Sequence, residues 1–185
     1  MPTVLITTSR NTSNRVRSFV RDLHSVLPRS ERFNRGGMNI KELVARISQS
    51  DAKAALVITM FKGNPRTIQI LLPTGSIGAT LFLESAILRR EIIPDKGPRI
   101  SGAISVCIEE NTSQQARILA DSLSELLDVM VSERTFPMCI GEKGRGQIEL
   151  WLSSLPNGKI LWTHYHALDA KEIGPRMRIT KYERS

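Results

Sequence analysis

Long apolar runs and sorting signals are missing from this chain of 185 residues. No apolar stretch reaches the length needed to cross a bilayer, and the first residues have neither the basic n-region nor the apolar h-region of a secretory signal. The sequence therefore predicts a cytoplasmic protein that makes no membrane contact.

Cysteine and aromatic residues are also scarce. The two cysteines, Cys107 and Cys139, stand in apolar surroundings without a C-x-x-C pair, which predicts reduced core residues and argues against redox and zinc chemistry. Aromatic residues make up 5% of the chain, and none of its strand-like segments is rich in them. Recognition of single-stranded RNA through a series of stacked bases is therefore disfavoured.

Motifs of catalysis are absent as well. The chain has no G-x-x-x-x-G-K-[ST] phosphate loop and no G-x-S-x-G elbow, and its glycine-rich segment 141–146 is an isolated turn. His164 and His166 would share one face of a strand and offer two ligands to a metal, but the pattern holds no third ligand. We expect no enzyme activity, cofactor, metal or small-molecule substrate.

The chain does have an excess of positive charge. Lys and Arg number 26 against 18 Asp and Glu, which gives a net charge of +8. Residues 1–100 hold 16 basic and 7 acidic residues, whereas residues 101–185 hold 10 and 11. Arginines outnumber lysines by 18 to 8, and a planar guanidinium group suits bidentate contacts to phosphate. Nucleic acid is thus the first partner to consider, and residues 1–100 are the half expected to face it.

The two halves resemble each other. When the sequence is shifted by 100 positions, Asn11-Thr12-Ser13 meets Asn111-Thr112-Ser113. Two later pairs of segments match in the same order, 72–75 with 155–158 and 97–100 with 174–177. We interpret this as an internal duplication. The first half also carries an insertion at about residues 28–53, which contains the basic residues Arg29, Arg32, Arg35, Lys41, Arg46 and Lys53.

Hydrophobic periodicity predicts a mixed α/β or α+β fold, with one mainly antiparallel sheet packed with helices in each half. In the first half we expect a helix after Asn39, which can form a capping box with Glu42. The other expected elements there are a strand at 3–8, a helix at about 13–26, and strands at 54–61, 66–72 and 79–88, the last also compatible with a helix. In the second half we expect a strand at 103–109, a helix at 112–132 with Met130 facing inward, and strands near 146–153, 159–166 and 176–182. The turn Pro156-Asn157-Gly158 predicts a hairpin.

The junction between the first strand and the first helix is the leading candidate for a phosphate site, because a helix N-terminus offers free N–H groups and a partial positive charge. The repeat provides a comparison, since its second copy keeps the capping triplet but carries acids and amides in place of the arginines. A capped helix with a solvated basic face is the alternative. The segment 29–37 adds arginines and the Gly36-Gly37 pair, which lets a backbone approach a ligand closely. The candidate RNA-binding residues are Ser9, Arg10, Arg15, Arg17, Arg21, Arg32, Arg35, Lys41, Lys62 and Arg66.

Four segments, 5–23, 32–43, 63–75 and 172–181, together resemble the Brix-domain family of ribosome-biogenesis factors, and in particular its small archaeal members. They follow the family's order and span nearly the whole chain. The resemblance implies a single Brix-like domain over residues 1–185, made of the basic half 1–100 with its inserted helix and the half 101–185. Each half is expected to be similar to the anticodon-binding domain of class II aminoacyl-tRNA synthetases.

The resemblance also implies a function. We expect a non-catalytic factor in rRNA processing or subunit assembly that binds structured ribosomal RNA or its precursor, together with ribosome-assembly proteins. One alternative is an adaptor within a ribonucleoprotein assembly complex whose basic half recognises an acidic partner segment. Another is a hydrolase or transferase that uses His164 and His166.

Overall fold

The apolar segment at the start of the chain forms the centre of a small parallel sheet. The computed structural model describes residues 1–185, except for the side chain of Ile104. Strand β1 (Val4–Thr8) lies between β2 (Ser30–Arg32) and β3 (Ala54–Phe61), and both neighbours run parallel to it. Strands β4 (Asn64–Leu71) and β5 (Ile77–Ile87) follow as antiparallel hairpins. The segment 79–88 is thus a strand, as expected.

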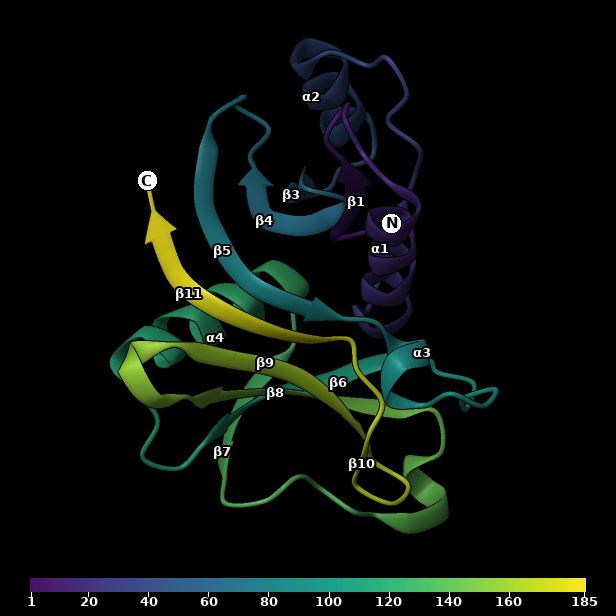
Figure 1. The fold of residues 1–185 in the computed structure, drawn as a ribbon, viewed down its shortest axis with the longest axis vertical. Coiled ribbons are helices and arrows are strands. Elements are labelled where there is room, and N and C mark those ends of the chain that lie inside the picture. Colours follow the sequence, from purple (N-terminus) through teal and green to yellow (C-terminus); the bar gives the residue numbers. More distant parts are fainter.

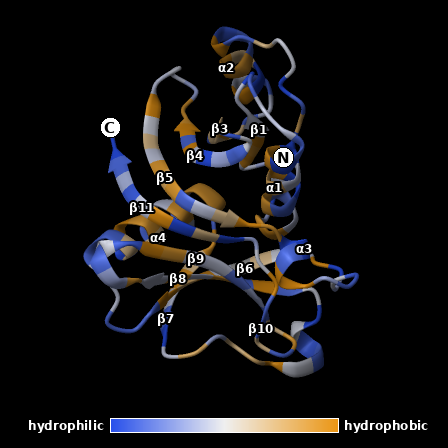
Figure 2. Cartoon of the chain, in the orientation of Figure 1, coloured by the Kyte–Doolittle hydropathy of each residue, from blue (hydrophilic) through white to orange (hydrophobic). Residues whose placement is uncertain are grey.

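Two helices cover opposite faces of this sheet. Helix α1 (Asn14–Val26) begins at Ser13, whose Oγ accepts the backbone N–H of Val16, and it packs on the face that includes Val4 and Ile6. Helix α2 (Ile40–Gln49) begins with the expected capping box and packs on the face that includes Leu5. Both helices carry hydrophobic and hydrophilic stretches (Figure 2), because each buries one side only.

A short connection leads into the second half. Helix α3 (Arg89–Ile92) is followed by β6 (Gly102–Glu109), α4 (Gln114–Leu127) and β7 (Met130–Arg134). The 3₁₀ turns η1 (Gly141–Gly144) and η2 (Pro156–Gly158) flank β8 (Gln147–Ser154), and β9 (Ile160–His166), β10 (Lys171–Glu172) and β11 (Arg176–Arg184) complete the chain. The predicted β8–β9 hairpin is present, with Asn157 at a φ of 65° in its turn.

All the strands belong to one eleven-stranded mixed sheet, in the order β2-β1-β3-β4-β5-β11-β9-β8-β6-β7, with β10 paired to β9. The predicted α/β class is therefore confirmed, but the expectation of a separate sheet in each half is wrong. The long strands β5 and β11 pair antiparallel between the two lobes and join them (Figure 1). The order and direction of the strands are the same in both halves, and the internal duplication stays a prediction.

Two further predictions need correction. The helix expected over 112–132 ends at Leu127, because Asp128 adopts a left-handed conformation with φ of 52°. Met130 therefore lies in β7, where its side chain is 79% exposed instead of facing the core. Cys107 is buried as expected, but Cys139 is exposed. Among the described residues, no helix is long and apolar enough to cross a membrane.

Candidate functional site

A cavity of about 490 Å³ lies at the carboxyl ends of β1 and β2, beside the start of α1. In open α/β sheets with helices on both faces, ligands usually bind at the carboxyl ends of the strands. The residues that line it are Thr8, Ser9, Arg10, Thr12, Arg17, Val20, Arg21, Arg32, Phe33, Asn34, Arg35 and Gly36. We call this the arginine cavity, since five arginines and no acidic residue belong to its lining.

The five arginines of the arginine cavity form no ion pair with the described side chains. Arg10 and Arg35 both donate to the carbonyl oxygen of Met38, at 3.4 and 3.0 Å. Burial and the neighbouring positive charge of Arg10 lower the pKa of Arg35. Crowded, uncompensated guanidinium groups favour the entry of an anion.

Local structure holds these groups around the cavity. Arg17 and Arg21 lie one turn apart on α1, so both reach the same side of the helix. The hydroxyl of Thr12, just before the helix, is buried and has no hydrogen-bond partner among the described residues. Gly36 lies in the cavity wall with a φ of 56°, a backbone conformation that residues other than glycine rarely adopt. The arrangement combines guanidinium groups without an ion-pair partner and a buried hydroxyl beside the start of α1, which together suit a phosphate. Residues 13–16, whose N–H groups the sequence predicted to contact the phosphate, do not belong to the lining of the cavity.

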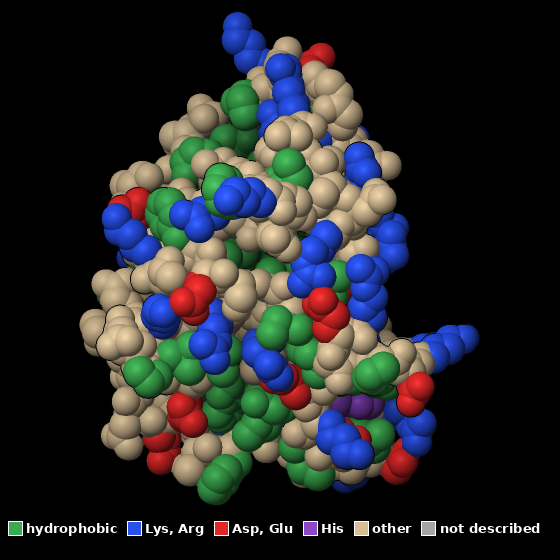
Figure 3. All heavy atoms as spheres, viewed as in Figure 1, with side chains coloured by type: hydrophobic (Ala, Val, Ile, Leu, Met, Phe, Trp, Pro, Cys, Tyr) green, Lys and Arg blue, Asp and Glu red, His purple; other side chains and the backbone are tan. Residues whose placement is uncertain are grey.

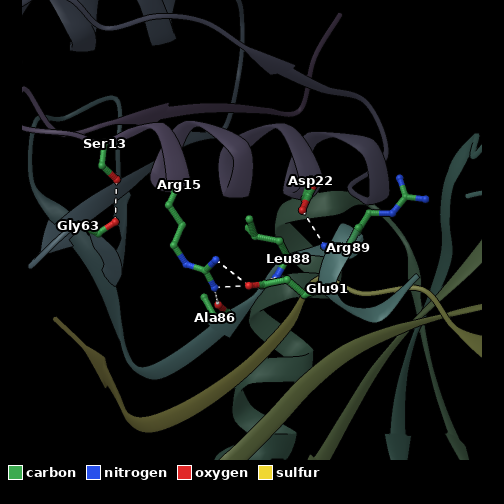
Figure 4. A network of polar contacts seen from close by, with 8 residues as sticks. All are labelled: Ser13, Arg15, Asp22, Gly63, Ala86, Leu88, Arg89 and Glu91. Carbon is green, nitrogen blue, oxygen red and sulfur yellow. Dashed lines mark hydrogen bonds and ion pairs between the residues drawn. The ribbon is translucent and has the colours of Figure 1, made fainter. Parts of the chain in front are cut away.

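Arg15, a predicted site residue, lies outside the arginine cavity. Its guanidinium group donates to both carboxylate oxygens of Glu91, at 2.8 and 3.0 Å, and to the carbonyl oxygen of Ala86 at 2.9 Å. Figure 4 shows this side chain extending from α1 toward α3, beside the contact between Asp22 and the backbone N–H of Arg89. The hydrogen bond to Arg15 lowers the pKa of Glu91. Arg15 therefore connects α1 to the end of β5 and to α3 through hydrogen bonds.

The remaining candidates divide into two groups. Ser9 lines the cavity and donates to the carbonyl oxygen of Asn11 at 2.7 Å. Lys41 is exposed in the first turn of α2, away from the lining. Lys62 and Arg66 are exposed on the β3–β4 hairpin. The structure thus brings together six of the ten predicted residues: Ser9, Arg10, Arg17, Arg21, Arg32 and Arg35.

The equivalent region of the second half has its arginines paired. Arg117, the counterpart of Arg17, forms a two-bonded ion pair with Glu133 at 2.9 and 3.1 Å. Arg134, at the end of β7, lies 3.0 Å from the buried carboxylate of Glu149. On the face shown in Figure 3, blue side chains prevail over the upper lobe, while blue and red alternate over the lower one. The free positive charge is therefore a feature of the first half.

The two histidines of β9 have structural partners. His164 is fully buried; its Nε2 accepts from Trp162 at 3.0 Å, and its Nδ1 donates to the carbonyl oxygen of Pro175 at 2.9 Å. His166 Nε2 accepts the backbone N–H of Gly146 at 2.9 Å. Burial lowers the pKa of His164 to about 3. No group of three or more His, Cys, Asp or Glu residues suited to a metal occurs among the described residues.

Sequence reasoning missed some of the cavity wall. Asn34 and Phe33 line it after β2, and only the parallel pairing of β2 with β1 brings them beside Thr8. The arginines at 32 and 35 indicated that this segment contributes to the site. The sequence did not indicate that Phe33 and Asn34 would lie beside the end of β1.

The comparisons with known proteins agree with this architecture. The chain is 30% identical to a probable Brix domain-containing ribosomal biogenesis protein of Methanopyrus kandleri over 128 residues, which are 67% of this chain and 66% of that protein. It is 29% identical to the U3 small nucleolar ribonucleoprotein protein imp4 of Schizosaccharomyces pombe over 126 residues, which are 68% of this chain and 43% of that protein. The chain thus spans less than two thirds of each of these relatives.

A solved structure extends the likeness to the whole fold. The crystal structure of a probable ribosomal biogenesis protein from Aeropyrum pernix K1 superposes with a TM-score of 0.77 over 98% of this chain and 97% of that one, at 24% sequence identity. No protein-family model matches the chain. The fold is that of a two-lobed α/β protein with one continuous sheet. The chain belongs to the Brix-domain family, which confirms the resemblance noted in the sequence.

Proposed function

We propose that this chain is a non-catalytic ribosome-biogenesis factor whose arginine cavity binds phosphates of structured ribosomal RNA. The similar proteins of Methanopyrus and Aeropyrum are named as ribosomal biogenesis proteins, which supports a role in ribosome biogenesis. The relative in Schizosaccharomyces is named as a protein of a small nucleolar ribonucleoprotein, which supports a role in a ribonucleoprotein complex. The alternative hypothesis of a hydrolase or transferase depends on His164 and His166. Both side chains are buried, and their ring nitrogens form hydrogen bonds with neighbouring residues of the fold.

The difference in arginine pairing between the two halves is the observation that carries this proposal. Both halves place arginines near the carboxyl ends of their parallel strands. In the second half these arginines form ion pairs with Glu133 and Glu149, whereas in the first half the five cavity arginines form no ion pair with any described carboxylate. Free guanidinium groups gain most from an external anion, and phosphate takes them in bidentate geometry.

The proposal also assigns different partners to the two halves of the single domain 1–185. Residues 1–100 contact RNA, and residues 101–185 remain available to a ribosome-assembly protein. Two apolar side chains at the outer edge of the second half, Met130 and Phe136, are 79% and 76% exposed, which favours a protein partner there.

The test is the salt dependence of affinity for a structured ribosomal RNA fragment. We expect the logarithm of affinity to fall linearly with the logarithm of salt concentration, and R17A/R21A to reduce the slope by about 0.7 to 0.9 for each lost phosphate contact. The control variant R178A/R184A removes the same charge from β11 and should leave the slope close to that of the wild type.

Two outcomes would contradict the proposal. A nearly flat salt dependence of the wild-type protein would rule out phosphate binding. Retained RNA affinity in R17E/R21E, with loss of a co-purifying acidic protein, would instead establish the adaptor function.

A further inference from the structure

Phe61, at the end of β3, is an aromatic side chain that the core does not use. It is 57% exposed, whereas Ile58 on the same strand is fully buried. The sheet faces covered by α1 and α2 end before this position, since neither core cluster includes Phe61. Exposing an aromatic ring to water is unfavourable, so a ligand that covers it would gain free energy.

Two cations lie near the ring of Phe61. Lys62 Nζ lies 5.4 Å from the ring centre, and the guanidinium carbon of Arg66 lies 5.7 Å from it. Both distances approach the outer limit of about 6 Å for a cation–π contact, so neither cation is stacked tightly on the ring. Neither Lys62 nor Arg66 forms an ion pair with the described side chains. The hairpin therefore presents an exposed apolar ring close to two positive charges that have no ion-pair partner among the described side chains.

The hairpin is held in place relative to the arginine cavity. Its two-residue turn has positive φ at Lys62 and Gly63, 48° and 79°, which matches the twist of the flanking strands. The carbonyl oxygen of Gly63 accepts a hydrogen bond of 2.7 Å from Ser13, the residue that caps α1. Figure 4 shows this contact at the start of α1. Because β1 and β3 are parallel, Phe61 and the cavity occupy the same edge of the sheet, on either side of the β1–α1 loop.

We propose that Phe61 is a stacking platform for one unpaired nucleobase of the bound RNA, with Lys62 and Arg66 taking the phosphates beside it. This inference rests on the proposed function. An apolar ring suits the face of a base, and the two cations suit the charges on its backbone. An acidic peptide would engage the cations but leave the ring without a stacking partner. The RNA preferred by this chain therefore has a bulged or looped nucleotide next to the paired segment whose phosphates enter the cavity.

The experiment compares two RNA hairpins that differ by a single unpaired purine, with the full chain and matched variants. Wild type should bind the bulged hairpin more tightly than the fully paired one, and F61A should lose about 5- to 150-fold in affinity for the bulged hairpin, the range known for one stacked base. F61A should bind the paired hairpin like wild type, and F61W should restore the preference. F136A removes a ring that is 76% exposed in the second half and should change neither affinity.

The outcomes separate this inference from the proposed function. Two results would overturn the role of Phe61. Wild type could bind both hairpins in a salt-dependent way with no preference for the bulge, or F61A could lose the same factor in affinity for both hairpins. Either result would leave the proposed phosphate binding by the arginine cavity standing. Absence of salt-dependent binding to either hairpin would overturn both. A thermal melt of F61A that matches wild type shows that the variant is folded.

Discussion

Arg17 and Arg117 occupy equivalent positions in the two halves, but their surroundings differ. Arg17 donates to the side chain of Asn14 at 3.1 Å and lines a cavity, whereas Arg117 is held by Glu133. The sequence repeat predicted that the first copy would be the functional one. That prediction was based on Glu109 and Glu110. The carboxylate that pairs with Arg117 instead belongs to Glu133 on β7, which becomes a neighbour of Arg117 only in the folded protein.

His164 gives the residue-scale prediction, which concerns acid stability. The native state keeps this histidine neutral, with a pKa of about 3, while an unfolded histidine titrates near 6.5. Below pH 6.5 the unfolded state takes up a proton that the folded state does not, so the free energy of unfolding should fall by about 1.4 kcal/mol for each pH unit toward pH 3. Above pH 6.5 this contribution is fully present.

Urea unfolding between pH 4 and pH 7.5 checks this expectation. H164Q should be less stable than wild type at neutral pH but should lose less further stability on acidification. H24Q, at a partly buried histidine of α1, should keep most of the wild-type acid sensitivity. If H164Q and wild type show the same slope against pH, other groups cause the acid sensitivity.

At the scale of elements, the contact between α1 and the segment that follows β5 depends on Arg15. Its three hydrogen bonds to Glu91 and Ala86 make it part of the scaffold, although the sequence placed it in the phosphate site. R15M keeps the apolar stem and removes these bonds, and both charged side chains are about one third exposed. We expect a loss of about 1 kcal/mol in the free energy of unfolding and a small change in RNA affinity.

The matched variant R17M should give the opposite result, with nearly unchanged stability and a clear loss of RNA affinity, because Arg17 faces the cavity. Thermal melts and RNA titrations of both variants measure the two quantities side by side. An equal loss of RNA affinity in R15M and R17M would show that Arg15 contacts RNA after all.

Most elements were predictable because their signals are local. Alternating apolar residues, the Ser13 cap and the Asn39–Glu42 capping box located β1, α1 and α2. The end of α4 was not predictable, because the apolar pattern continues to Met130. The helix stops at Asp128, where Lys53 and Arg29 from the other half bind the carboxylate of Asp128 and the last carbonyls of the helix. A helix end that depends on distant cations leaves no local signal.

At the scale of the whole molecule, the pairing of β5 with β11 decides the architecture. Each half has the same arrangement of strands, and their last strands join into one sheet with β2 and β7 at the outer edges. The sequence indicated two similar halves but not that their sheets would join. The partners in the pairing of β5 with β11 are 89 to 105 positions apart, and such a pairing depends on which edge each half leaves free. This arrangement places the arginine cavity near one outer edge and the exposed Met130 at the other.

The division between the halves is tested most directly by ultraviolet crosslinking of the protein to RNA in its own cells, with the crosslinked peptides mapped by mass spectrometry. We predict crosslinks in the segments 8–21, 32–36 and 61–66, on ribosomal RNA or its precursor, and few in residues 101–185. Crosslinks concentrated in residues 101–185, or their absence from the arginine cavity, would contradict the assignment of RNA binding to the first half.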